Sequence, residues 1–166
     1  MLARAVFEKL PALRHDRGIW NTILSSSERG DLTLAPDSIR SDRELMLLAC
    51  SKKNGFPIID VDESLLLDED FIRQVIATTP TALNYLPHVS QLRFPNIIFE
   101  NIEKMCDCRP NYFIKNVAPD ILASRSFAEA WFKAGGAFYD GYFPESLKDD
   151  KDIFHLSIDC QTHFFI

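Results

Sequence analysis

Residues 42–72 read DRELMLLACSKKNGFPIIDVDESLLLDEDFI, and this stretch decides the fold. Apolar side chains follow Asp42 at three, four, seven and eight residues, which is the spacing of one stripe on an α-helix. The pattern starts again at Asp68, with Phe71 and Ile72 in the same places. The stretch therefore predicts one complete unit of a helical repeat with a period of 26 residues.

The repeat extends in both directions from this stretch. Its anchor positions are Asp16, Asp42, Asp68, Phe94, Ser124 and Asp150, so that successive anchors lie 26, 26, 26, 30 and 26 residues apart. Residues three, four and eight positions after every anchor are apolar, and the seventh is polar only at Asn101 and Ser157. Asp and Ser side chains cap helices by accepting hydrogen bonds from the first turn. Each anchor is therefore predicted to open a helix of about 10 to 13 residues.

The ends of these helices also carry signals. Gly135-Gly136 supplies a residue that ends a helix in the left-handed conformation without steric strain. Thr79-Pro80 stops a helix by removing a backbone donor. Arg29-Gly30 and Asn54-Gly55 predict two further helix ends, and Ser41 with Glu44 reads as a capping box.

A second, shorter helix is predicted in each unit, because an apolar residue is followed by Pro or Asp, a polar pair and an aliphatic residue. This phrase occurs at 34–39, 61–65, 86–89, 117–122 and 143–147. Such short helix pairs bury their apolar faces only by stacking on one another. We expect an all-α protein: an α-solenoid of about six helix-pair repeats in a single domain over residues 1–166, with a partial repeat at 1–15.

The stretch from Asp42 to Gly55 and the new opening at Asp68 resemble the helical repeat catalogued as domain of unknown function four-one-one-six. In that family an Asp-x-Glu-aliphatic opening leads through Lys-x-Asn-Gly to a second short helix, and copies occur in tandem. The match covers Ser41 to about Arg93, whereas Phe94 and Ser124 depart from the anchor Asp. The resemblance implies a fold and a tandem arrangement, found in proteins of algae and other microbes, and no activity.

Composition excludes several classes of function. Eighteen basic and 24 acidic residues give a net charge of −6, which offers no basic surface for nucleic acid or an anionic membrane. No apolar run approaches the roughly 20 residues of a membrane span, although peripheral association with a complex stays open. Four scattered cysteines favour an intracellular, reducing compartment, either cytoplasm or organelle interior. The basic residues of Met1 to Arg17 leave a targeting role open.

Cys106-Asp107-Cys108 lies where the anchor spacing is four residues too long, around Met105 to Arg109. We expect a surface loop there, since insertions in repeat arrays emerge on one face and often contact partners. The candidate partner-binding residues are accordingly Met105, Cys106, Asp107, Cys108 and Arg109. An alternative is a thiol-dependent redox or enzymatic role for Cys106 and Cys108.

No set of residues predicts a metal site, a bound cofactor or a catalytic centre. Neither a Cys-x-x-Cys pair nor a calcium loop of the required spacing is present. Cys50 falls in an apolar column and is expected in the core. A pigment- or cofactor-binding accessory subunit, with His155 as ligand, is the other alternative.

The C-terminal edge points most directly to a partner. The last predicted helix carries Ile153, Phe154 and Ile158 in its apolar stripe, and no complete second helix follows. Phe164, Phe165 and Ile166 would add apolar surface there, so we expect them to anchor a partner chain. The sequence therefore favours a non-catalytic helical-repeat scaffold that mediates protein–protein interaction, as a subunit or fragment of a larger assembly.

Overall fold

The computed structural model describes residues 7, 9–27, 32–52, 56–108, 110–138 and 141–162. Within these ranges the regular structure is entirely helical and contains no strand, which confirms the all-α prediction. No helix in these ranges is both long and apolar enough to cross a membrane. The description excludes the side chains of Phe56, Asp107, Cys108, Pro110 and Asn111 and of residues 160–162.

Internal contacts divide the chain into two compact units, Met1–Pro87 and His88–Ile166. The boundary falls inside the predicted repeat that starts at Asp68. The single domain over residues 1–166 stays a prediction.

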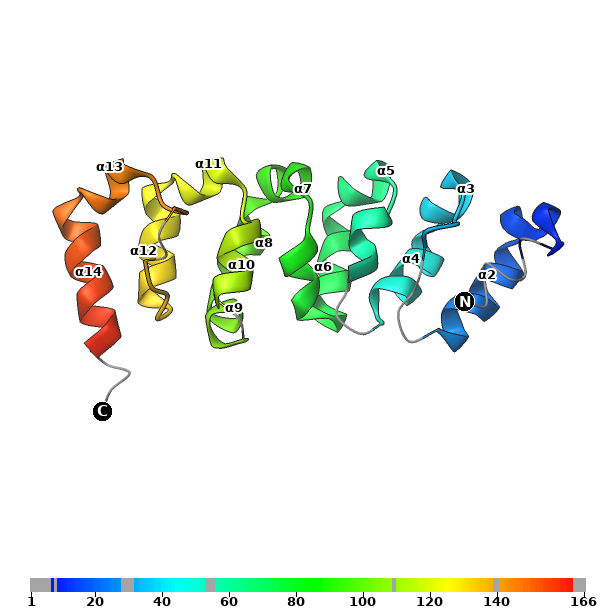
Figure 1. Cartoon of the computed structure of the whole chain (residues 1–166), viewed down its shortest axis with the longest axis horizontal. Coiled ribbons are helices and arrows are strands. Elements are labelled where there is room, and N and C mark those ends of the chain that lie inside the picture. The colour runs from blue at the N-terminus through cyan, green and yellow to red at the C-terminus, as the bar shows by residue number, and fades with distance from the viewer. Residues whose placement is uncertain are drawn as a thin grey trace. The chain divides into compact units, whose positions relative to one another are not determined.

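In the first unit, three longer helices lie side by side: α2 (Arg17–Ser26), α4 (Arg43–Cys50) and α6 (Glu69–Thr78) (Figure 1). The short helices α3 (Asp37–Arg40) and α5 (Glu63–Leu66) pack at one end of α4 and α6. The unit also contains the 3₁₀ helices η1 (Pro11–His15), η2 (Phe56–Asp60) and η3 (Pro80–Tyr85).

The second unit begins with α7 (His88–Arg93), α8 (Pro95–Glu100), α9 (Ile102–Cys108) and α10 (Pro110–Asn116). It continues with α11 (Pro119–Leu122), α12 (Arg125–Lys133), α13 (Glu145–Lys148) and α14 (Lys151–Thr162). The long helix α14 packs along α12 and against α13 (Figure 1). The short helices α3, α5, α7, α11 and α13 confirm the five predicted second helices.

The anchors cap their helices as predicted, except at Phe94. Each capping side chain accepts a hydrogen bond from the backbone N–H three residues on, at 2.9 to 3.2 Å: Asp16 from Ile19, Asp42 from Leu45, Asp68 from Phe71, Ser124 from Phe127 and Asp150 from Ile153. Phe94 precedes α8 without a side-chain cap. The capping box is wrong, because Asp42 caps α4 and the Ser41 hydroxyl donates to the Asp37 carbonyl instead.

The end of α12 forms the glycine cap expected at Gly135-Gly136. Gly135 has φ of +84° and its N–H donates to the Phe132 carbonyl, while the Gly136 N–H donates to the Trp131 carbonyl, both at 2.9 Å. A Cβ on Gly136 would lie 2.3 Å from the Trp131 ring, so this position accepts only glycine without a shift of the tryptophan. Helix α6 ends before Thr79-Pro80 as predicted, whereas Arg29-Gly30 and Asn54-Gly55 lie outside the described residues.

The predicted loop around Met105 to Arg109 is wrong for residues 105–108, which belong to α9. The chain instead turns at Asn101, between α8 and α9. There the Asn101 side-chain amide donates to the Ile97 carbonyl at 2.9 Å, in competition with the regular helix. The four extra residues therefore belong to a helical segment that Asn101 divides into α8 and α9, and not to a loop. Helices α4 and α12, at eight and nine residues, are also shorter than expected.

Both cores are built from the predicted apolar columns. The residues three positions after the anchors are buried in every helix but α2, where Ile19 is half-buried. The two polar members of the seventh column, Asn101 and Ser157, are buried too, and each donates a hydrogen bond to a carbonyl of its own helix. Cys50 is fully buried, which confirms its place in the core.

Candidate protein-interaction face

An arginine directly after the anchor links three pairs of neighbouring helices. In the first unit, the Arg17 Nε donates to Asp42 Oδ2 at 2.7 Å, and Arg43 pairs in the same way with Asp68. Each arginine reaches the residue that caps the next long helix, 25 positions later. The pairing thus joins one helix opening to the next.

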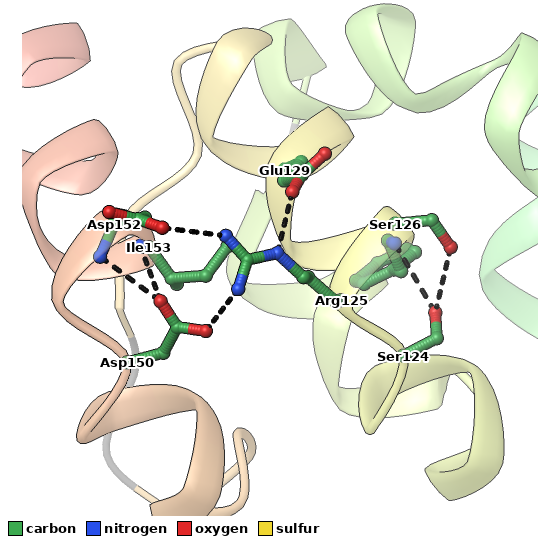
Figure 2. A network of polar contacts seen from close by, with 8 residues as sticks. Ser124, Arg125, Ser126, Glu129, Asp150, Asp152 and Ile153 are labelled. Carbon is green, nitrogen blue, oxygen red and sulfur yellow. Dashed lines mark hydrogen bonds and ion pairs between the residues drawn. The ribbon is translucent and has the colours of Figure 1, made fainter.

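The third link lies in the second unit, between α12 and α14 (Figure 2). The Arg125 guanidinium donates to Asp150, to Asp152 at 3.2 Å and to Glu129 of its own helix at 2.9 Å. Asp150 also caps α14, so one carboxylate serves both the helix opening and the link. The hydrogen bond from Arg125 to Glu129 is the largest of the effects that raise the arginine's pKa, and the charge persists at every physiological pH.

Two of the capping carboxylates, Asp42 and Asp68, have lowered pKa values. At Asp42, burial is the largest single effect and raises the pKa, but hydrogen bonds from Arg17 and from the Leu45 N–H outweigh it. At Asp68 the main cause is the hydrogen bond from the Phe71 N–H. Because the folded-state pKa lies below the ordinary value, the stability these groups add is complete above that value and is lost as the pH falls through the folded-state pKa.

Helix α14 has one buried and one exposed side. Ile153 and Ser157 are buried at three and seven positions after the anchor, and α14 packs along α12 and α13. The equivalent residues of α12 meet the preceding helices, since the Phe127 ring lies 6.1 Å from Phe99 and the Trp131 ring 6.1 Å from Phe113. The third and seventh residues of α12 thus contact the preceding helices, and Phe127 also lies 6.5 Å from Phe143, which follows α12.

The opposite side of α14 is the candidate functional site. Lys151, Phe154, His155 and Ile158 are all exposed and follow the spacing of one helical stripe. We call these four residues the α14 outer face. It presents two large apolar side chains with a cation at the N-terminal end, and the Phe154 and His155 rings lie 6.4 Å apart.

The same two register positions are buried after each of the five preceding anchors. Four positions after the anchor stand Trp20, Met46, Ile72, Ile98 and Ala128, all 0% exposed. Eight positions after it stand Leu24, Cys50, Ile76, Ile102 and Phe132, none more than 5% exposed. In α14 these positions are Phe154, at 49%, and Ile158, at 45%. The helix thus exposes the side that the other helices bury.

Lys151 occupies the register position of Arg17, Arg43 and Arg125, directly after the anchor. It makes no ion pair within the described part of the chain. Our sequence analysis missed this residue. The signal was a basic residue directly after four of the six anchors, which becomes informative only once the arginines are seen to reach the next cap.

The structure brings the predicted residues of the Cys-Asp-Cys segment onto a helix. Met105 is buried at 2% exposure, and Cys106 is half-buried. The side chains of Asp107 and Cys108 and the whole of Arg109 lie outside the described residues, as do Phe164, Phe165 and Ile166. The proposed thiol pair and the tail anchors therefore stay predictions.

Within the described ranges, no cluster of three or more His, Cys, Asp or Glu side chains has a metal-binding arrangement. Burial raises the pKa of the Cys50 thiol to about 12, so it is not a thiolate nucleophile at neutral pH. His155, the candidate pigment ligand, is exposed on α14.

Comparisons with protein-family models, curated proteins and solved structures yielded no match to this chain.

Proposed function

We propose that the chain is an α-solenoid of about six helix-pair repeats with a period near 26 residues, and that it is a non-catalytic scaffold for another protein. The recurring caps and the three arginine links, each between residues 25 positions apart, support the repeat. A tandem helical repeat similar to domain of unknown function four-one-one-six remains part of this proposal.

The observation that carries the function is the exposure of Phe154 and Ile158. Exposed apolar side chains are ordinary when they occur singly. These two differ because they lie on one stripe and because the equivalent residues after the five other anchors are buried. A partner that covers the α14 outer face would restore the burial that the equivalent residues have.

The proposal includes an intracellular, reducing compartment, in keeping with a buried thiol at Cys50. Association as a subunit of a larger assembly follows from the same face. No nucleic acid is proposed, because the net charge is −6.

A matched pair of double variants tests the function. Phe154→Asp with Ile158→Lys disrupts the α14 outer face, whereas Val89→Lys with Leu92→Asp changes an equally exposed apolar pair on α7, at 42% and 47%. Circular-dichroism melts should show both variants folded. Proteins enriched from source cells by the wild-type chain and by the α7 variant, but not by the α14 variant, are the expected partners.

The affinity of such a partner then gives the size of the effect. We expect the α14 variant to weaken binding by about 30-fold or more, equivalent to about 2 kcal/mol, as for anchor residues of an interface. Equal binding to the wild type and to both variants would show that this face is not the docking site.

A further inference from the structure

The internal contacts of the chain indicate what kind of surface fits the α14 outer face. Where α6 covers α4, Asp68 pairs with Arg43, and the buried residues of α6 include Phe71 and Val75, three and seven positions after its cap. The Arg43 guanidinium also lies over the Phe71 ring, 5.7 Å from its centre. One acidic cap and two apolar residues therefore make up the covering face.

The same covering face recurs twice more. On α4, which packs against α2, it consists of Asp42, Leu45 and Ala49, and on α14 it consists of Asp150, Ile153 and Ser157. The residue three positions after the cap is large and apolar in every case, whereas the one seven positions after it is small: Val, Ala or the polar Ser157. The acidic cap always meets a basic residue directly after the anchor of the helix that is covered.

The α14 outer face repeats two features of the helices that are covered: a basic residue after the cap, and apolar residues at the fourth and eighth positions. Lys151 stands at the position of the three arginines, and Phe154 and Ile158 stand at the two positions that are buried in the other helices. The charge of Lys151 indicates the chemistry of the partner, because a lysine at this position would pair with an acidic group at the start of the incoming helix. The surface continues the register of the interface already formed between α12 and α14.

Resting on the proposed function, we infer that the partner protein docks an amphipathic α-helix whose acidic N-cap pairs with Lys151 and whose third and seventh residues after the cap cover Phe154 and Ile158. The helix approaches as α14 approaches α12. Its other side is free to be polar or to meet the rest of the partner.

A synthetic helix tests this chemistry on the intact chain. The probe is a fluorescein-labelled peptide with the sequence of residues 68–79, stapled on its outer side because a free peptide of this length is not a stable helix. Ile72→Gln and Ile76→Lys in the peptide remove its second apolar stripe, and Asp68, Phe71 and Val75 are kept. Fluorescence anisotropy should give saturable binding with a Kd of about 1 mM or tighter.

A double-variant cycle then tests the charge pair. A peptide with Asp68→Asn keeps the capping acceptor but loses its charge. We expect the Asp68→Asn peptide to bind the wild-type chain at least threefold more weakly than the parent peptide, which keeps Asp68. The two peptides should bind the Lys151→Gln chain with equal affinity. Phe154→Asp in the chain or Phe71→Asp in the peptide should abolish binding, and the α7 variant should bind normally.

The results separate the inference from the proposed function. Absence of saturable peptide binding, with native partners still lost from the α14 variant, would overturn the capped-helix inference and leave the scaffold intact. Peptide binding with native partners retained by the α14 variant would overturn the function. Self-association of the wild-type chain in analytical ultracentrifugation, lost in the α14 variant, would assign the face to a second copy and overturn the inference.

Discussion

Helices α12 and α14 open alike and end up in different surroundings. Each begins at a capping residue, Ser124 or Asp150, continues with a basic residue and buries the third and seventh positions after the cap. The fourth and eighth positions differ: Ala128 and Phe132 are fully buried, whereas the corresponding pair on α14 is about half exposed.

The difference lies in what packs on the second stripe. Phe132 packs against Phe138 and Phe143, with ring centres 4.5 and 5.6 Å away, and α14 packs along the same helix. Within the described residues, the Phe154 ring contacts only the ring of the neighbouring His155, and Ile158 is 45% exposed. The same sequence pattern therefore gives a fully buried stripe in α12 and a half-exposed one in α14, according to the neighbouring elements.

The largest effect is expected when the same charge is placed at the same register position of both helices. Phe132→Asp should cost more than the 3 to 5 kcal/mol of a Phe→Ala change in a core, because it also buries an unpaired carboxylate. Ile158→Asp should change the stability of the isolated chain by less than about 0.5 kcal/mol, as for other surface substitutions. Urea unfolding of both variants measures the two values.

Similar destabilisation by the two substitutions would break the comparison, since Ile158 would then be part of the core. Gln74→Asp, on the exposed side of α6, provides the control for placing a carboxylate on a helix surface.

A smaller effect is expected at the helix openings, where the two helices are alike. Ser124→Ala removes the acceptor for the Phe127 N–H and should cost about 1 kcal/mol. Asp150→Asn keeps a good capping acceptor and removes only the charge that pairs with Arg125, so its effect should be smaller. Thermal melts at low salt give the order, and an Asp150→Asn variant less stable than Ser124→Ala would mean that the ion pair outweighs the cap.

Much of the fold was predictable because the first helices and their caps follow local rules. The apolar columns predicted which residues are buried from Trp20 to Phe132, and the short phrases predicted all five second helices. Local periodicity failed for η2, η3 and α10, since elements of five to seven residues hold too few turns to display a stripe. It also placed a loop around Met105 to Arg109, whereas residues 105–108 belong to α9 and the helix breaks earlier, at Asn101.

The candidate site was only half predictable. Phe154 and Ile158 fit the apolar columns, and the sequence analysis expected this edge to be uncovered. Their exposed fraction depends on neighbouring elements and does not follow from the pattern itself. The importance of Lys151 required the arginine links, which join residues 25 positions apart and have no local signature.

The smallest expected effect compares the two basic residues that follow the caps. Arg125→Gln removes the pairs with Asp150 and Asp152, so it should lower the melting temperature slightly at low salt. The loss should shrink as salt rises, because this guanidinium is about half exposed and salt screens such pairs. Lys151→Gln should leave the melting temperature of the isolated chain unchanged at every salt concentration, since no partner within the described residues is lost. Once a partner occupies the α14 outer face, the same Lys151→Gln substitution should weaken binding in a salt-dependent manner.

A melting temperature lowered equally by the two substitutions in the isolated chain would mean that Lys151 is already paired. The proposed equivalence between the α12–α14 interface and the α14 outer face would then be wrong.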